Sequence, residues 1–189
     1  MEDLVIMPHI SLPDGVAGIV GPMMAYPETA KHLNGLAEAL LRGPSSLTIA
    51  ERETIASSVS AENECYFCTN CHAAAARHLL GDQRAVVDAV IKDVATAPVS
   101  EKLRALLDIA AKVRVDGRSV TPEDIACARA AGADDKAVHD TVLIAAAFCM
   151  YNRYVDGLAT WSPHDAAMYE KIGEKLATKG YLTSVPIRS

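Results

Sequence analysis

The stretch Cys65-Tyr66-Phe67-Cys68-Thr69-Asn70-Cys71-His72 places three cysteines and one histidine within eight residues. It contains two overlapping C-x-x-C pairs, Cys65/Cys68 and Cys68/Cys71. The first pair is typical of redox-active thiols, whereas the second, followed by His72, matches the C-x-x-C-H signature of covalently attached haem. The choice between the two registers therefore decides which function this stretch predicts.

Helix geometry favours the first register. Successive residues of an α-helix are rotated by about 100°. With Cys65 at zero, Cys68 lies at about −60° and His72 at about −20°, so the three share one face. Cys71 lies further round, at about −120°. The pattern therefore selects Cys65-x-x-Cys68-x-x-x-His72 and leaves the role of Cys71 open.

The selected residues can perform thiol chemistry together. A thiol in the first turn of a helix lies at the positive end of the helix dipole, which predicts a lowered thiol pKa. An i, i+3 spacing allows a disulfide, and an imidazole on the same face can exchange protons with a thiol. If the preceding helix turns back across Glu62-Asn63-Glu64, Glu53 comes within reach of His72 and can orient it.

The rest of the chain predicts an all-α fold in a single domain, residues 1–189. Half of the residues are hydrophobic, but there are only two Phe and one Trp, which indicates closely packed helices with small side chains. Residues 1–12 are expected to form an extended arm, because Pro8 and Pro13 disfavour regular structure. About eight helices are expected, with the C-x-x-C at the start of a core helix: about 27–42, 48–61, 65–81, 82–94, 100–115, 121–132, 134–157 and 162–180.

The run Val142 to Met150 is apolar at almost every position. A helix that is apolar around its whole circumference must be buried in a core or covered by another subunit. The run therefore predicts a homo-oligomer.

Charge and cysteine usage exclude several classes of protein. The formal charge is −6 and no basic stripe is present, which argues against a nucleic-acid partner. Met1-Glu2-Asp3 lacks the basic start of a signal peptide, and the apolar stretch 16–26 is too short and too rich in glycine to span a membrane. Five cysteines, mostly clustered, do not form a disulfide framework, so we expect a cytoplasmic protein with functional thiols.

Other interpretations of the cysteines are weaker. Covalent haem requires maturation in an exported compartment. A zinc site of Cys65, Cys68, Cys71 and His72 has enough ligands, but ligands on one continuous helix cannot all surround a tetrahedral ion. Cys127 and Cys149 are expected to be inert packing residues.

The sequence resembles the AhpD-like superfamily, the group of alkylhydroperoxidase AhpD and carboxymuconolactone decarboxylase. The match is carried by Leu47-Thr48-x-x-Glu51-Arg52-Glu53, then Asn63, and then Cys65-x-x-Cys68-x-x-x-His72. The late segment Asn152-Arg153-Tyr154-Val155-Asp156-Gly157 is most similar to the peroxidase-related branch of this group.

The resemblance implies an all-α fold that assembles into dimers, trimers or hexamers and reduces organic hydroperoxides. It assigns attack on the peroxide to Cys68, resolution to Cys65, and proton relay to His72 and Glu53. It implies no cofactor and no metal, and a lipoyl or thioredoxin-like dithiol as reductant. A thiol sensor without peroxidase turnover and a lactone decarboxylase-like lyase are the alternatives. The chain departs from the family at Glu64, where many members have Gly, and at Cys71.

Overall fold

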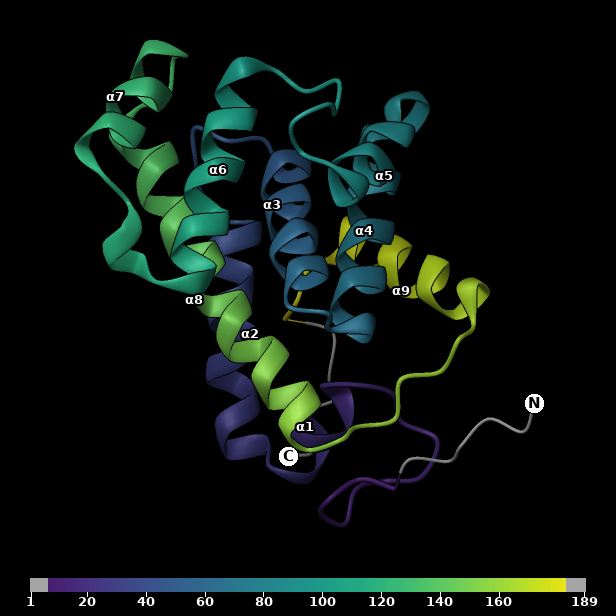
Figure 1. Cartoon of the computed structure of the whole chain (residues 1–189). Helices are drawn as coiled ribbons and strands as arrows, with labels where there is room; N and C mark the ends of the chain where they lie inside the picture. Colours follow the sequence, from purple (N-terminus) through teal and green to yellow (C-terminus); the bar gives the residue numbers. More distant parts are fainter. Residues whose placement is uncertain (1–6, 183–189) are drawn as a thin grey trace.

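The computed structural model describes residues 7–182, which form nine α-helices and two short 3-10 turns (Figure 1). The all-α prediction is confirmed. The α-helices are α1 (Val20–Ala25), α2 (Pro27–Leu41), α3 (Ile49–Glu62), α4 (Tyr66–Leu80), α5 (Ala85–Lys92), α6 (Glu101–Val115), α7 (Pro122–Ala130), α8 (Asp135–Gly157) and α9 (Ala166–Lys179).

Most predicted helices form, but three helix starts differ from the prediction. Helix α1 was not expected, because its stretch contains Gly21 and Pro22; a proline in the first helical turn removes no intrahelical hydrogen bond. Asp82 does not cap a helix: a 3-10 turn occupies 81–83, and α5 starts after Arg84. Helix α9 begins after Asp165, whose carboxylate accepts two backbone N–H bonds, rather than at Ser162-Pro163. Of the predicted N-terminal arm, residues 7–12 have no helix or strand, and residues 1–6 lie outside the described part.

A three-residue turn joins α3 to α4 and fixes the start of the cysteine helix. Glu64 N–H donates to the carbonyl of Ala61, and Cys65 N–H donates to that of Ser60. This is a Schellman ending, in which Glu64 holds the left-handed position with φ = 59°. Glycine is preferred at such a position, so Glu64 places a side chain on a backbone conformation that disfavours one. The turn sends α4 back along α3.

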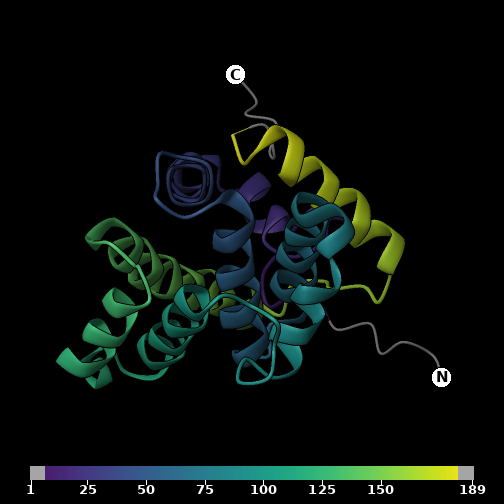
Figure 2. The ribbon, with the colours of Figure 1, turned by 90° about the horizontal axis from the view of Figure 1, so that it is seen from above.

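Helix α4 lies between α3 and α9, and α8 packs on the other face of α3 (Figures 1 and 2). The four alanines 73–76 of α4 are all buried. Their small size allows α9 to approach closely: a Cβ built on Gly173 would lie 2.4 Å from the Cβ of Ala74. Because of this close crossing, the end of α9 and the residues that follow it lie over α4, the helix that contains the cysteines.

The apolar run in α8 is only partly buried in the single chain. Ile144 and Phe148 are buried, whereas Leu143 is 37% exposed and Met150 is 43% exposed. The core of the single chain therefore leaves part of the circumference of α8 exposed. Within the described residues, none of the helices has the length and apolar character needed to cross a membrane.

Candidate active site

The three clustered cysteines are all buried and free, and they occupy different positions on α4. Cys65 is the N-cap residue, with extended backbone angles, and Cys68 lies in the first turn. The side chains of these two residues hydrogen bond to each other. Cys71 lies one turn further along, inside regular helix. The structure thus brings Cys65 and Cys68 into contact, as the first register predicts.

Helix α3 brings Glu53 to His72, which is the contact that the antiparallel turn predicts. His72 Nδ1 lies 2.8 Å from Glu53 Oε2, and the Glu53 side chain is completely buried. Because carboxylates only accept hydrogen bonds when ionised, this contact places the imidazole proton on Nδ1. Nε2 is then the acceptor nitrogen, and within residues 7–182 it has no hydrogen-bond partner. With Glu53 behind it, His72 can therefore act as a base toward a group that lies on the Nε2 side of the imidazole.

Two residues that the sequence did not single out complete this buried group. The Tyr181 hydroxyl donates to Glu53 Oε1 at 2.6 Å and lies 3.2 Å from His72 Nδ1. Arg42 Nη2 lies 2.7 Å from Glu53 Oε1, and its guanidinium stands 5.1 Å from the centre of the Tyr181 ring. Arg42 follows α2 and Tyr181 follows α9, so neither is near the cysteine motif in sequence. No spacing in the chain signals either contact.

These partners keep Glu53 ionised despite its burial. Burial by itself raises the pKa of a carboxyl group. Here the electrostatic interaction and hydrogen bond with His72, the charge of Arg42 and the hydrogen bond of Tyr181 outweigh burial, and the pKa of Glu53 is lowered below its ordinary value. Glu53 is therefore a fixed negative charge behind the imidazole.

The prediction of a lowered thiol pKa is wrong for Cys68. The hydrogen bond with Cys65, together with burial, raises the pKa of Cys68 well above its ordinary value. Burial and the nearby Cys65 also raise the pKa of Cys71 well above its ordinary value. The helix dipole favours a thiolate, but loss of hydration and neighbouring sulfurs have the larger effect in this dry environment. The resting Cys68 thiol therefore carries its proton, which a base must take before it can act as a nucleophile.

Helix α8 contributes two further polar contacts to the thiols. Asn152 hydrogen bonds to Cys68, an interaction that lowers the thiol pKa and partly opposes burial. Its amide is held by Asn63 at 2.9 Å and by Ser60 at 3.1 Å. Asp156 hydrogen bonds to Cys65. Both residues belong to the segment 152–157, which resembles the peroxidase-related branch. The resemblance therefore includes residues that contact the thiols.

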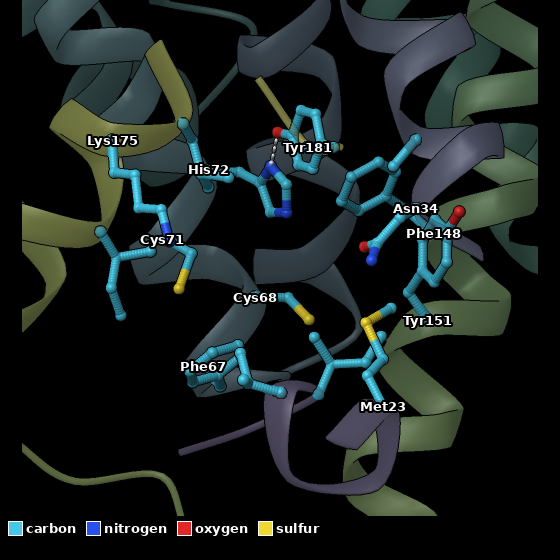
Figure 3. A pocket seen from close by; sticks show the side chains of 15 residues that line it. Met23, Asn34, Phe67, Cys68, Cys71, His72, Phe148, Tyr151, Lys175 and Tyr181 are labelled. Carbon is cyan, nitrogen blue, oxygen red and sulfur yellow. Dashed lines mark hydrogen bonds between the residues drawn. The ribbon is translucent and has the colours of Figure 1, made fainter. Parts of the chain in front are cut away.

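A cavity of about 280 Å³ opens beside Cys68, Cys71 and His72 (Figure 3). Cys65 is not part of its wall. The wall is mainly apolar, and it is contributed by α1, α2, α4, α8, α9 and Tyr181: Ile19, Val20, Met23, Asn34, Ala37, Phe67, Cys68, Cys71, His72, Phe148, Tyr151, Ile172, Lys175, Leu176 and Tyr181. Such a cavity suits a small ligand with an apolar body that reaches Cys68 and His72.

The described residues hold no group of three or more His, Cys, Asp or Glu side chains arranged to bind a metal ion. Cys127 is exposed and far along the chain from the cluster, whereas Cys149 is half-buried. Cys149 accepts a 3.6 Å hydrogen bond from the Asn63 amide and donates one of 3.8 Å to the Arg114 carbonyl. These two cysteines lie outside the cavity wall.

The fold and site define an all-helical protein in which a C-x-x-C pair starts a core helix beside a buried glutamate–histidine pair. The carboxymuconolactone decarboxylase family model matches residues 27–112, which include all four of these residues. This match supports the assignment of the chain to the AhpD-like superfamily of alkylhydroperoxidase AhpD and carboxymuconolactone decarboxylase.

Solved structures agree with this assignment. An uncharacterized peroxidase-related protein from Silicibacter sp. TM1040 is 29% identical, with a TM-score of 0.71 over 79% of this chain and 78% of its own. An uncharacterized peroxidase-related protein with an alkylhydroperoxidase AhpD core, from Ralstonia eutropha JMP134, is 26% identical, with a TM-score of 0.74 over 84% and 81% of the two chains. A protein of unknown function from Agrobacterium tumefaciens, proposed as the antioxidant defence protein AhpD, shares the fold at 20% identity, with a TM-score of 0.67 over 78% and 99%. No curated protein matches the chain significantly.

Proposed function

We propose that this protein is a thiol-dependent peroxidase that reduces organic hydroperoxides. The observation that carries the proposal is the position of Cys68 and His72 on the wall of one apolar cavity, with Glu53 buried behind the imidazole. An apolar wall favours an alkyl or aryl hydroperoxide over hydrogen peroxide, because burial of the organic part contributes to binding. The relatives called peroxidase-related or antioxidant point in the same direction.

In the first step, His72 Nε2 accepts the Cys68 proton and the sulfur attacks the terminal peroxide oxygen. The S–O bond forms, the O–O bond breaks, and the imidazolium returns its proton to the leaving alkoxide. Cys68 is thereby oxidised to a sulfenic acid and the hydroperoxide is reduced to an alcohol. Glu53 stabilises the positive imidazolium between the two proton transfers, as a buried carboxylate does in other catalytic triads.

In the second step, the Cys65 thiol attacks the Cys68 sulfenic acid, which forms a disulfide and releases water. An external dithiol, lipoyl or thioredoxin-like, then reduces the disulfide by thiol exchange. None of these steps uses a cofactor or a metal. We place the reaction in the cytoplasm and in a homo-oligomer, in which another subunit covers the exposed apolar side chains Leu143 and Met150 of α8.

The test is steady-state reduction of cumene hydroperoxide with a dihydrolipoyl or thioredoxin-type dithiol. We expect turnover by the wild-type protein and none by Cys68→Ser, with Cys127→Ser as a matched control that keeps full activity. An equally active Cys68→Ser protein contradicts the proposal. If the wild type forms one disulfide per chain but does not turn over with any dithiol, the thiol pair serves as a redox sensor instead. A lyase of the decarboxylase type predicts activity that survives loss of both thiols.

A further inference from the structure

Asn34 is a polar residue on the otherwise apolar inner face of α2. The other buried residues of this helix are Ala30, Ala37, Leu40 and Leu41. Asn34 is only 8% exposed, yet within residues 7–182 its side-chain amide makes no hydrogen bond. Among the described residues, the polar side-chain atoms that are sealed from solvent without a partner belong to Arg42, Thr141, Thr160 and Tyr169, so the Asn34 amide is open to the cavity that it lines.

A hydrogen-bond partner for the Asn34 amide can therefore lie in the cavity. Asn34 lines the cavity, and Figure 3 shows its amide directed toward the same space as the Cys68 sulfur and the His72 ring. The three groups come from two helices, α2 and α4, and they surround this space from different sides (Figure 3). A nucleophile, a proton carrier and an amide donor thus face one small volume. Ala37 and Phe148 form apolar parts of the wall beside this volume, and Lys175 and Tyr181 also line the cavity.

We propose that Asn34 binds the peroxy group of the substrate and donates a hydrogen bond from Nδ2 to the oxygen that leaves as the alkoxide. This inference rests on the proposed peroxidase function and adds a residue to it. As Cys68 forms the S–O bond and the O–O bond breaks, negative charge grows on the leaving oxygen. Asn34 stabilises this charge without giving up its proton, and the proton itself comes from the His72 imidazolium.

The chemistry also explains why an amide suits this position better than a charged donor. A buried ammonium or guanidinium would add a second uncompensated charge beside Arg42 and the imidazolium. A neutral amide in a dry cavity is a fixed dipole that needs no reorganisation when the charge develops. Because no group within residues 7–182 hydrogen bonds to this amide, it is available to a bound substrate.

The experiment compares Asn34→Leu and Asn34→Asp with the wild type. Asn34→Leu removes the amide and keeps the number and branching of the side-chain heavy atoms, and Asn34→Asp keeps the shape but removes the donor. For each protein, the second-order rate of Cys68 oxidation by cumene hydroperoxide is measured in a single turnover. The rate of Cys68 alkylation by iodoacetamide and the midpoint of thermal unfolding are measured on the same samples. Asn70→Leu, at a half-buried position of α4 outside the cavity wall, is the matched control.

We expect both Asn34 variants to lose about 100-fold in the peroxide rate, the usual effect of removing one hydrogen-bond donor from a developing oxyanion. Alkylation of Cys68 should stay within about threefold of the wild type in Asn34→Leu, because the thiol and His72 are unchanged. The unfolding midpoint of Asn34→Leu should stay close to that of the wild type, because the Asn34 amide makes no hydrogen bond within residues 7–182 that the substitution would break.

A wild-type peroxide rate in either variant overturns the role of Asn34 and leaves the peroxidase proposal standing. A lowered unfolding midpoint with equal losses in the peroxide and alkylation rates also overturns the role of Asn34, because these results indicate that Asn34 acts structurally. Failure of the wild type to react with any hydroperoxide overturns the peroxidase proposal itself, and the role of Asn34 with it.

Discussion

The Tyr181 hydroxyl donates a 2.6 Å hydrogen bond to Glu53 Oε1, which joins two residues 128 positions apart in the chain. The contact forms because α9 crosses α4 closely at Gly173 and the chain then returns over the cysteine helix. Glu53 thereby receives hydrogen bonds on both carboxylate oxygens. The orientation of the proposed proton carrier, His72, depends on a residue near the end of the sequence.

Tyr181→Phe removes this hydroxyl and keeps the ring that stacks on His72. A hydrogen bond to a charged group contributes about 1.5–3 kcal/mol, so we expect the free energy of unfolding to fall by about that amount. The pKa of Glu53 should rise, because the Tyr181 hydrogen bond lowers it. Chemical denaturation measures the first effect. Tyr26→Phe, at an exposed tyrosine, should change neither quantity.

Glu53→Gln removes the charge that faces both Arg42 and His72. Breaking a buried ion pair from one side costs about 3–5 kcal/mol, since the other charge remains buried. The loss should depend on pH. The folded-state pKa of Glu53 is lowered from 4.5, so its contribution to stability is fully present above about pH 4.5 and disappears as the pH falls through the folded-state pKa.

The difference in unfolding free energy between wild type and Glu53→Gln should therefore narrow below about pH 4.5. Glu62→Gln, which breaks a partly exposed pair with Arg114, should cost no more than about 1 kcal/mol. A difference that widens on acidification would contradict the lowered pKa of Glu53.

Cys65→Ala should make Cys68 more reactive toward alkylation, although it abolishes the proposed disulfide. The hydrogen bond with Cys65 is the largest cause that raises the pKa of Cys68. Without it, the pKa of Cys68 falls and more thiolate is present near neutral pH. Site-resolved mass spectrometry after a short iodoacetamide pulse measures the rate. Unchanged or slower alkylation of Cys68 in the variant would contradict the role of Cys65 in raising the Cys68 pKa.

Cys71→Ala should leave the Cys65–Cys68 disulfide of the oxidised protein unchanged. This result would show that Cys71, whose role the sequence leaves open, takes no part in the disulfide. Residues three apart inside a helix have Cβ atoms about 5–6 Å apart, whereas a disulfide needs about 3.5–4.5 Å. Cys68 and Cys71 are related in this way, but Cys65 is an N-cap and can swing toward Cys68 as a capping side chain does. Peptide mapping of the wild type should find Cys65–Cys68. A Cys68–Cys71 disulfide would require distortion of α4.

Glu64→Gly should stabilise the protein, since Glu64 has a φ of 59° at the end of α3. Glycine adopts this conformation without steric cost, and we expect a gain of about 0.5–1 kcal/mol in unfolding free energy. Glu64→Ala removes the same charge but keeps the Cβ atom. If Ala gives the same gain as Gly, the charge and not the backbone is responsible.

Local features of the sequence predicted much of the fold. The helices expected to start near Thr48 and Thr121 do so, because each start is fixed by a capping box, Thr48/Glu51 or Thr121/Asp124, that is complete within four residues. The shared face of Cys65, Cys68 and His72, and the approach of Glu53 across a short turn, also follow from helix geometry. The start of α9 could not be placed in this way, because two start signals, Ser162-Pro163 and Asp165, lie close together.

The sequence by itself determined which side chains can do chemistry, since their spacing on one helix and across one turn depends only on local geometry. The tertiary structure decided their protonation and surroundings. Burial and the Cys65 contact raise the pKa of Cys68, opposite to the direction that its place at a helix start predicts. Arg42 and Asn34 reach the site only through the packing of α2 on α3 and α8, and Tyr181 only through the packing of α9 on α4. Hydration and long-range contacts set the electrostatics of a buried site, and neither can be deduced from the spacing of residues along a chain.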